Sequence, residues 1–211
     1  SLSSAERVHP TDLWERKIFD WLEPTLVDAI QKYNFSDETR IELDRYLLAF
    51  MQTSSKDAAT SLCQLCLGLS ETQTQLKART FWKLCAGFFE AIAKDKLEVD
   101  LNVKRIASGI VVHYNSMSHG EWLFSDKFML HLLFFCEQAI IDESDDAGTP
   151  LLSIIKQVWG LKNDESINYK INRYGHFDPA ILAQARKRIV VAKELWTALS
   201  GGDLQKIRST V

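Results

Sequence analysis

The chain has 211 residues, of which 46% are hydrophobic and 25% are charged, and its formal net charge is −3. These proportions are typical of globular domains, and they exclude an intrinsically disordered or fibrous chain. A nearly balanced charge provides no overall field that would attract nucleic acid or an anionic membrane. We therefore expect a folded protein that recognises its partners locally.

Membrane insertion and secretion are not expected. The most apolar stretch, residues 128–136, is far shorter than the roughly 20 apolar residues that a transmembrane helix needs. Residues 1–9 lack the basic start and apolar run of a secretory signal. Four cysteines in a chain of this length suit a reducing compartment. We expect a cytoplasmic protein.

Apolar residues recur at helical spacing along most of the chain, and no stretch shows the alternation of a strand. The first predicted helix carries Trp14, Ile18, Trp21 and Leu22, and Pro24 ends it. A second helix begins near Ser36 and Asp37, which are suitable caps. Its apolar positions are Leu43, Leu47 and Phe50, and those of a third helix are Ala59, Leu62, Cys63, Cys66 and Leu67.

Two neighbouring helices, expected to be antiparallel, follow over residues 81–92 and 103–114. Residues 95–100 form the short charged connection between them. The next helix, over residues 122–141, is apolar around nearly its whole circumference. A helix of this kind is surrounded by other helices, so we expect it to be the central one.

The C-terminal part begins with an acidic segment, residues 142–148, that predicts a solvated loop. A helix over residues 151–161 is stopped by Gly160, and residues 162–177 are polar and irregular. Asp178 and Pro179 predict the start of the last helix. Its expected buried seam consists of Ala185, Ile189, Ala192, Trp196 and Leu199.

The predicted fold is therefore all-α, a bundle of about eight helices that in part resembles histidine-phosphotransfer bundles. We expect one domain over residues 11–203, with tails at residues 1–10 and 204–211.

Cys63 and Cys66 have the C-x-x-C spacing of a zinc site. A second pair of ligands is missing, because Cys85 and Cys136 are isolated and no histidine lies at ligand spacing from them. We expect the two cysteines to face the core, and neither a metal nor a cofactor is predicted. Strained serine or cysteine turns and glycine-rich phosphate loops are also missing, so no catalytic residue is predicted.

His113 and His131 are the candidate sites for histidine phosphotransfer. A phosphotransfer histidine is exposed in mid-helix and is followed about one turn later by lysine and glycine. Phe134 and Phe135 follow His131, and Ser116 and Met117 follow His113. Both histidines are better interpreted as packed side chains, and they stay the candidates if phosphotransfer occurs.

Two features could contact a protein partner. Arg186, Lys187 and Arg188 form a cationic run on the polar face of the last helix, without an aromatic platform for nucleic-acid bases. Solvent exposure or an acidic protein partner is the preferred interpretation. Trp159, near a helix end, is a candidate interface anchor.

Three stretches resemble one signalling family: FWKLCAGFFEA at 81–91, VKRIAS at 103–108, and FDP at 177–179 continuing through QARKRI at 184–189 to KELWTALSGGD at 193–203. They are similar to the N-terminal, non-kinase region of chemotaxis-type hybrid histidine kinases of type IV pilus systems, and to the related FimL scaffold family. The resemblance implies a fragment of a signalling protein that acts with response regulators or polar scaffold proteins. It supplies no phosphorylation site here.

The leading hypothesis is a non-catalytic scaffold domain of the two-component signalling that controls type IV pili and twitching motility. The alternative is a phosphotransfer domain that relays phosphate to a response regulator. A third hypothesis is a small molecule bound between the helices, because such a site needs no sequence motif.

Overall fold

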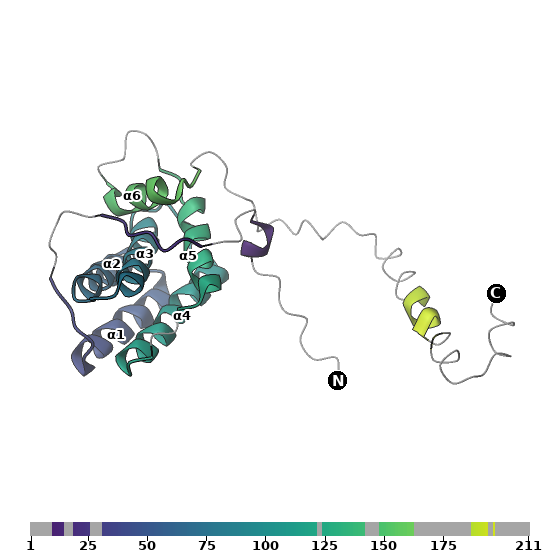
Figure 1. Ribbon diagram of the computed structural model, residues 1–211, viewed down its shortest axis with the longest axis horizontal. Coiled ribbons are helices and arrows are strands. Elements are labelled where there is room, and N and C mark those ends of the chain that lie inside the picture. The colour runs from purple at the N-terminus through teal and green to yellow at the C-terminus, as the bar shows by residue number, and fades with distance from the viewer. Residues whose placement is uncertain are drawn as a thin grey trace, which may run out of the picture. The chain divides into compact units, whose positions relative to one another are not determined.

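The structure is a computed structural model that describes residues 10–14, 19–25, 31–121, 124–141, 148–162, 187–193 and 196. The chain divides into two compact units, Ser1–Ile167 and Asn168–Val211. Every regular element among the described residues is a helix (Figure 1). The predicted all-α class is therefore confirmed, whereas the single domain over residues 11–203 stays a prediction.

The described part of the first unit contains one short 3-10 helix and α-helices that largely match the predicted ones. They are η1 (Pro10–Leu13), α1 (Asp37–Thr53), α2 (Lys56–Glu71), α3 (Leu76–Ala93), α4 (Leu101–Ser118), α5 (Asp126–Gln138) and α6 (Pro150–Trp159). Local sequence sets several of their ends. The predicted cap Ser36 accepts a hydrogen bond from the backbone N–H of Thr39, and α6 ends at Gly160, whose φ of 59° favours glycine.

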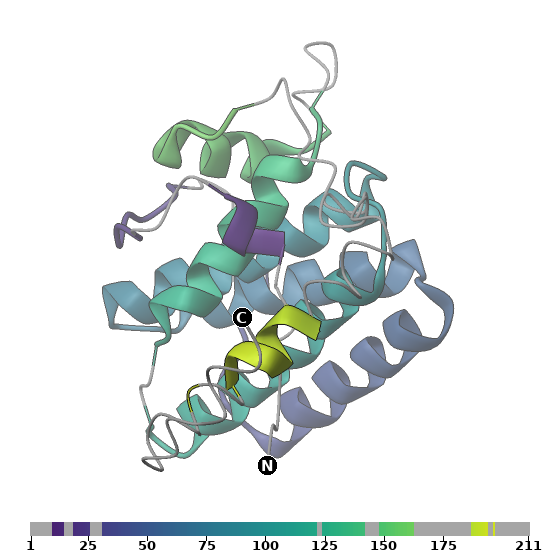
Figure 2. The same cartoon turned by 90° about the vertical axis from the view of Figure 1, so that its right-hand side faces the viewer.

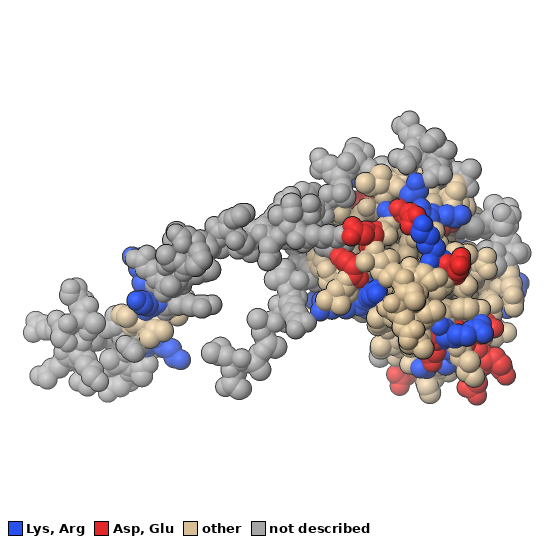
Figure 3. Space-filling model, turned by 180° about the vertical axis from the view of Figure 1, so that it is seen from behind, with Lys and Arg blue, Asp and Glu red and all other residues tan. Residues whose placement is uncertain are grey.

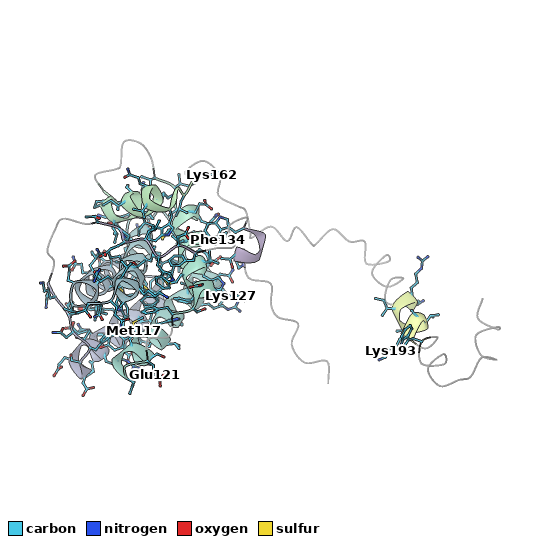
Figure 4. All side chains as sticks on the ribbon, viewed as in Figure 1. Met117, Glu121, Lys127, Phe134, Lys162 and Lys193 are labelled. Atoms are coloured by element: carbon cyan, nitrogen blue, oxygen red, sulfur yellow. The ribbon has the colours of Figure 1, made fainter. Side chains whose placement is uncertain are left out.

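The central helix is α3 and not the helix predicted over residues 122–141. It packs against α2, α5 and α6, and most of its side chains are buried. Small residues allow this close approach, because a Cβ atom on Gly87 would lie 2.2 Å from Cδ1 of Ile155 on α6. The helix predicted as central is α5, which Ser125 caps at its start. On α5, Phe134 is buried and Lys127, two turns earlier, is exposed (Figure 4).

The prediction of a first helix through Trp14, Trp21 and Leu22 is wrong. Of the residues described there, 10–13 form η1 and 19–25 are not helical, while Ile18 lies outside the described residues. These residues cross between α6 and the α2–α3 pair as the purple segment of Figure 1. Side chains of the bundle satisfy the backbone of this segment, since Trp159 donates to the Asp20 carbonyl at 2.9 Å and Thr80 donates to that of Leu22 at 3.0 Å. Tertiary hydrogen bonds thus replace those of a helix.

Helix α4 lies alongside α1 and runs antiparallel to it, as Figures 1 and 2 show from two sides. Arg40 near the start of α1 hydrogen bonds to Asn115 near the end of α4. At the opposite end of the pair, Lys104 Nζ donates to the Met51 carbonyl at 2.8 Å. The predicted neighbour α3 meets α4 through ring contacts, such as the one between Trp82 and Tyr114, whose centroids lie 6.1 Å apart.

In the second unit, the described residues 187–193 and 196 are helical. The predicted helix start at Asp178 and Pro179 lies outside the described residues. Part of the predicted buried seam is exposed instead, with Ile189 at 68% and Trp196 at 75%. Spacing alone therefore overestimated the burial of these two residues.

No helix in the described ranges is both long enough and apolar enough to cross a membrane. Positive and negative side chains are interspersed on the face that Figure 3 shows, without a broad area of one sign. This distribution agrees with the small net charge of the sequence.

Candidate interaction site

His113 is packed between two aromatic rings. Its ring centroid lies 4.4 Å from that of Phe128 and 5.1 Å from that of Phe81, with interplanar angles of 26° and 29°. Nδ1 lies 2.9 Å from the Gly109 carbonyl oxygen, which fixes this nitrogen as the protonated one. The side chain is half-buried. These contacts make His113 part of an aromatic cluster at the junction of α3, α4 and α5.

His131 is held in a similar way on α5. Its Nε2 is buried, and its ring meets that of Phe128 edge-on at a centroid distance of 6.5 Å. Phosphate transfer requires a histidine nitrogen that the donor and acceptor proteins can reach in line. The buried Nε2 of His131 lacks such access, and both histidine rings contribute to packing.

Trp159 is internal, which corrects its interpretation as a surface anchor. Its side chain is only 4% exposed, and its ring stacks with that of Phe19 at 6.0 Å. The indole N–H donates to the carbonyl of Asp20, as described above. A buried indole that finds a backbone acceptor is satisfied within the fold. Trp159 therefore attaches residues 19–25 to the bundle.

The cationic run lies in the second unit. Lys187 is exposed on the helical residues 187–193, and Arg188 is exposed beside it. Arg186 lies outside the described residues. The interpretation of this run as a protein-binding surface thus stays a prediction.

A polar cluster that the sequence reasoning missed joins residues 19–25 to α3. The Glu23 carboxylate accepts from Arg79 Nε at 2.9 Å and Nη2 at 3.0 Å, and from Lys83 Nζ at 2.9 Å. Lys83 also donates to the Pro24 carbonyl at 2.9 Å. Hydrogen bonds from Arg79, together with those from Lys83, lower the pKa of Glu23 to about 2. The Glu23 carboxylate is therefore ionised at neutral pH.

The only sequence signal for this cluster was the placement of two cations one turn apart on a very apolar helix. Arg79 and Lys83 stand at i and i+4, so they lie on one side of α3. Lys83 lies outside the apolar stripe of α3, yet its side chain is only 8% exposed. Burying a lysine requires a counter-charge, and Glu23 supplies it. The counter-charge lies about 60 residues away in sequence, so spacing could not identify it.

The start of α6 is stabilised by another residue off the apolar stripe. The Glu90 carboxylate on α3 accepts from the backbone N–H of Leu152 at 2.7 Å. Thr149, the N-cap residue of α6, makes no capping hydrogen bond through its side chain. A carboxylate at a helix N-terminus satisfies free N–H groups and complements the helix dipole. Glu90 thus joins α3 to α6.

All four cysteines are buried, as the sequence predicted for Cys63 and Cys66. Burial raises the pKa of the Cys63 and Cys136 thiols to about 12. It also raises the pKa of Cys66 and Cys85 well above their usual range. Thiols in this state are poor metal ligands and poor nucleophiles. Within the described ranges, no three His, Cys, Asp or Glu side chains are grouped so that they could hold a metal ion.

The described residues of the first unit thus form a helical bundle to which residues 19–25 are attached. Their buried polar groups join elements to one another: Glu23 with Arg79 and Lys83, Glu90 with α6, and Trp159 with the Asp20 carbonyl.

A comparison with known protein families places most of this chain in a described family. Residues 33–170, more than half of the chain, match the family described as FimL scaffold protein second domain. No curated protein matches the chain significantly. No solved structure matches it significantly either. The matched range contains α1 to α6 and begins after the attached residues 19–25. The chain therefore belongs to the FimL scaffold protein family, in the part that corresponds to its second domain.

Proposed function

We propose that this protein is a non-catalytic scaffold in the chemosensory, two-component signalling that controls type IV pili and twitching motility. Its partners are response regulators or polar scaffold proteins of that system, and it acts in the cytoplasm. The observation that carries the proposal is the match of residues 33–170 to a scaffold family.

The geometry of the histidines favours a scaffold over a phosphorelay. A relay histidine needs an accessible and freely oriented ring, whereas the Nε2 of His131 is buried and the ring of His113 is held by stacking on Phe81 and Phe128. All four thiols are buried, so no cysteine is placed to act as a nucleophile. The domain is suited to binding without chemistry.

Binding is tested with the purified 211-residue chain immobilised on a biosensor. The response regulators and polar scaffold proteins of the pilus system from the same organism are applied singly, up to micromolar concentrations. A receiver domain from an unrelated two-component system is the control. We expect saturable binding of at least one pilus protein and none of the control. No binding of any pilus protein at micromolar concentration contradicts the proposal.

A second measurement separates scaffold from phosphorelay. The chain is incubated with the active cognate kinase and labelled ATP, beside variants His113→Gln and His131→Gln. We expect no label on the chain. Acid-labile label that disappears in one variant would establish phosphotransfer through that histidine.

A further inference from the structure

The bundle holds residues 19–25 in the manner of a bound peptide. Side chains of α3 and α6 donate to three of the segment's carbonyl oxygens, at positions 20, 22 and 24. The donors are Trp159 Nε1 and Lys83 Nζ, both at 2.9 Å, and Thr80 Oγ1 at 3.0 Å. All three donor residues are buried. Every peptide has backbone carbonyls, so these bonds fix the course of the segment without selecting its sequence.

Two aromatic side chains of the segment supply selectivity. Phe19 is 7% exposed, and its ring stacks with that of Trp159 at a centroid distance of 6.0 Å. The ring of Trp21 meets that of Phe124 edge-on at 5.3 Å, and Lys77 Nζ lies 5.1 Å from the Trp21 centroid. The position between the two aromatic residues is exposed. Aromatic residues at alternate positions of the segment thus each contact a ring of the bundle.

The Glu23 carboxylate meets two cations of α3. The side chain of Lys83 is 8% exposed and that of Arg79 is 30% exposed. Within the described parts of residues 31–162, no other carboxylate forms an ion pair with either cation. The pKa of Arg79 is raised chiefly by its hydrogen bonds to Glu23, and Glu71 adds to this effect at longer range. A lysine this buried needs a counter-charge, which the rest of the bundle does not supply here.

The residues that hold the segment form what we call the docking site: Arg79, Thr80 and Lys83 on α3, and Trp159 on α6. The docking site lies inside the matched family domain, residues 33–170, whereas Glu23 lies outside it. The domain therefore buries a lysine whose counter-charge comes from beyond its own limits. A site built in this way binds a carboxylate-bearing peptide, which residues 19–25 provide in cis.

This arrangement specifies one kind of partner. We propose that residues 19–25 occupy the docking site as a cis ligand, and that a segment of a partner protein displaces them. The partner's segment has two aromatic residues and a glutamate at alternate positions, as Phe19, Trp21 and Glu23 are placed here. Its glutamate takes over both ion pairs of Glu23, so the buried lysine keeps a counter-charge. This inference rests on the proposed scaffold function, for which it supplies a contact site and a way to regulate it.

The cis segment determines how strongly a partner must bind. It is joined to the docking site through the chain, so its effective concentration there is high. A separate ligand binds only the molecules whose docking site is open, and its apparent dissociation constant is the intrinsic value divided by that open fraction. The identical segment of a second copy gains nothing over the cis segment. A displacing ligand is therefore a segment of another protein with a better fit to the same contacts.

The first test measures the binding of a separate peptide to the whole chain. The probe is a fluorescent synthetic peptide of residues 17–26, and its anisotropy is followed with the parent chain and with the double variant Phe19→Ala, Glu23→Gln. The double variant weakens the cis segment, so we expect it to bind the probe about tenfold or more tightly than the parent. Adding Lys83→Met should remove this gain, whereas adding Arg105→Met on α4 should not. Equal affinities of parent and double variant, or no binding up to millimolar concentration, overturn the inference.

A measurement on the parent chain does not depend on the folding of these variants. Hydrogen–deuterium exchange is followed by mass spectrometry with and without a mass-labelled, non-fluorescent probe at several millimolar, which approaches the effective concentration of a tethered segment. We expect the probe to speed exchange in the chain's own residues 19–25 and to leave α1 unchanged. Unchanged exchange in residues 19–25 overturns the inference.

Photocrosslinking in the native host identifies the partner. A photoreactive phenylalanine analogue replaces Lys77, beside the position of Trp21, in the double variant, and it replaces the exposed Arg105 in a matched control. We expect position 77, and not position 105, to crosslink to a segment of another protein with aromatic residues and a glutamate at alternate positions. A crosslinked segment without this pattern, a crosslink to a second copy of this chain, or no crosslink overturns the inference.

These experiments also separate the docking site from the proposed function. The anisotropy and exchange measurements involve only this chain and its own segment. Their failure rejects the docking site and leaves the biosensor test of the scaffold function intact. A crosslinked segment of the expected pattern from a protein outside pilus signalling would retain the docking site and reject the function.

Discussion

Replacing Glu23 with glutamine is the most direct way to weaken the attachment of residues 19–25 to the bundle. The substitution keeps the shape of the side chain and removes its charge. It leaves the guanidinium of Arg79 and the buried ammonium of Lys83 without their shared carboxylate. Lys83 keeps the Pro24 carbonyl as an acceptor. One carbonyl oxygen does not compensate the charge of an ammonium group whose side chain is only 8% exposed.

The pKa of Glu23 gives the scale of the effect. Its fall from 4.5 to about 2, at about 1.36 kcal/mol for each tenfold change in proton affinity, corresponds to an upper bound of about 3.4 kcal/mol. The side chains of Glu23 and Arg79 are 26% and 30% exposed, so solvent screens part of this interaction. We expect Glu23→Gln to lower the free energy of unfolding by about 2 kcal/mol.

Urea unfolding at pH 7, followed by circular dichroism, measures this loss. The matched control is Asp44→Asn, which breaks the exposed pair of Asp44 with Arg40 on α1, where both side chains are more open. We expect the control to cost about 0.5 kcal/mol or less. A loss for Glu23→Gln no larger than that for the control would refute the reasoning. A double-mutant cycle with Lys83→Met should show coupling of about 1 kcal/mol or more between the two positions.

The same carboxylate predicts a pH dependence. Its pKa is lower in the folded state than the ordinary 4.5, so its contribution is complete above about pH 5.5 and is lost as the pH falls from 4.5 toward 2. The difference in stability between the parent chain and Glu23→Gln should therefore shrink over this acid range. A difference that stays constant from pH 7 to pH 3 would show that the charge of Glu23 does not stabilise the fold.

Three further predictions concern the packing of the bundle. Gly68→Ala should lower the free energy of unfolding by about 2 kcal/mol, because a Cβ atom there would lie 2.2 Å from the backbone oxygen of Gln31. Gly87→Ala should change it by less than about 1 kcal/mol, because the Cβ atom would meet only the flexible end of the Ile155 side chain. Urea unfolding of the two variants compares them, and equal losses would contradict this assignment. Ser36→Ala should cost about 1 kcal/mol in the same assay through loss of the α1 cap, and an unchanged midpoint would contradict it. All four cysteines should resist a disulfide reagent at pH 8 until the chain is unfolded, and rapid reaction of the native protein would show that a thiol is accessible.

Periodicity predicted α1 to α4 and α6 because these helices depend on information that is local in sequence. Caps such as Ser36 and stops such as Gly160 act within a few residues, and an apolar stripe shows which side of a helix is buried. The core positions of Cys63 and Cys66 were predicted for the same reason.

Predictions from sequence alone were wrong where tertiary contacts outweigh local preferences. The spacing of Trp14, Trp21 and Leu22 indicated a helix, yet bonds from Thr80 and Trp159 hold residues 20–22 in a non-helical course. Trp159 near a helix end suggested an interface, and Phe19 covers it. Each of these outcomes depends on a residue more than 50 positions away, which a spacing pattern cannot encode.

The sequence by itself determined the all-helical class, most helix limits and the family resemblance, because propensity, capping and apolar spacing are local properties. Only the tertiary structure decided that α3 is central, that Glu23 pairs with both Arg79 and Lys83, and that Trp159 is buried against Phe19. These features arise from contacts between distant segments. Their geometry is fixed only when the helices pack.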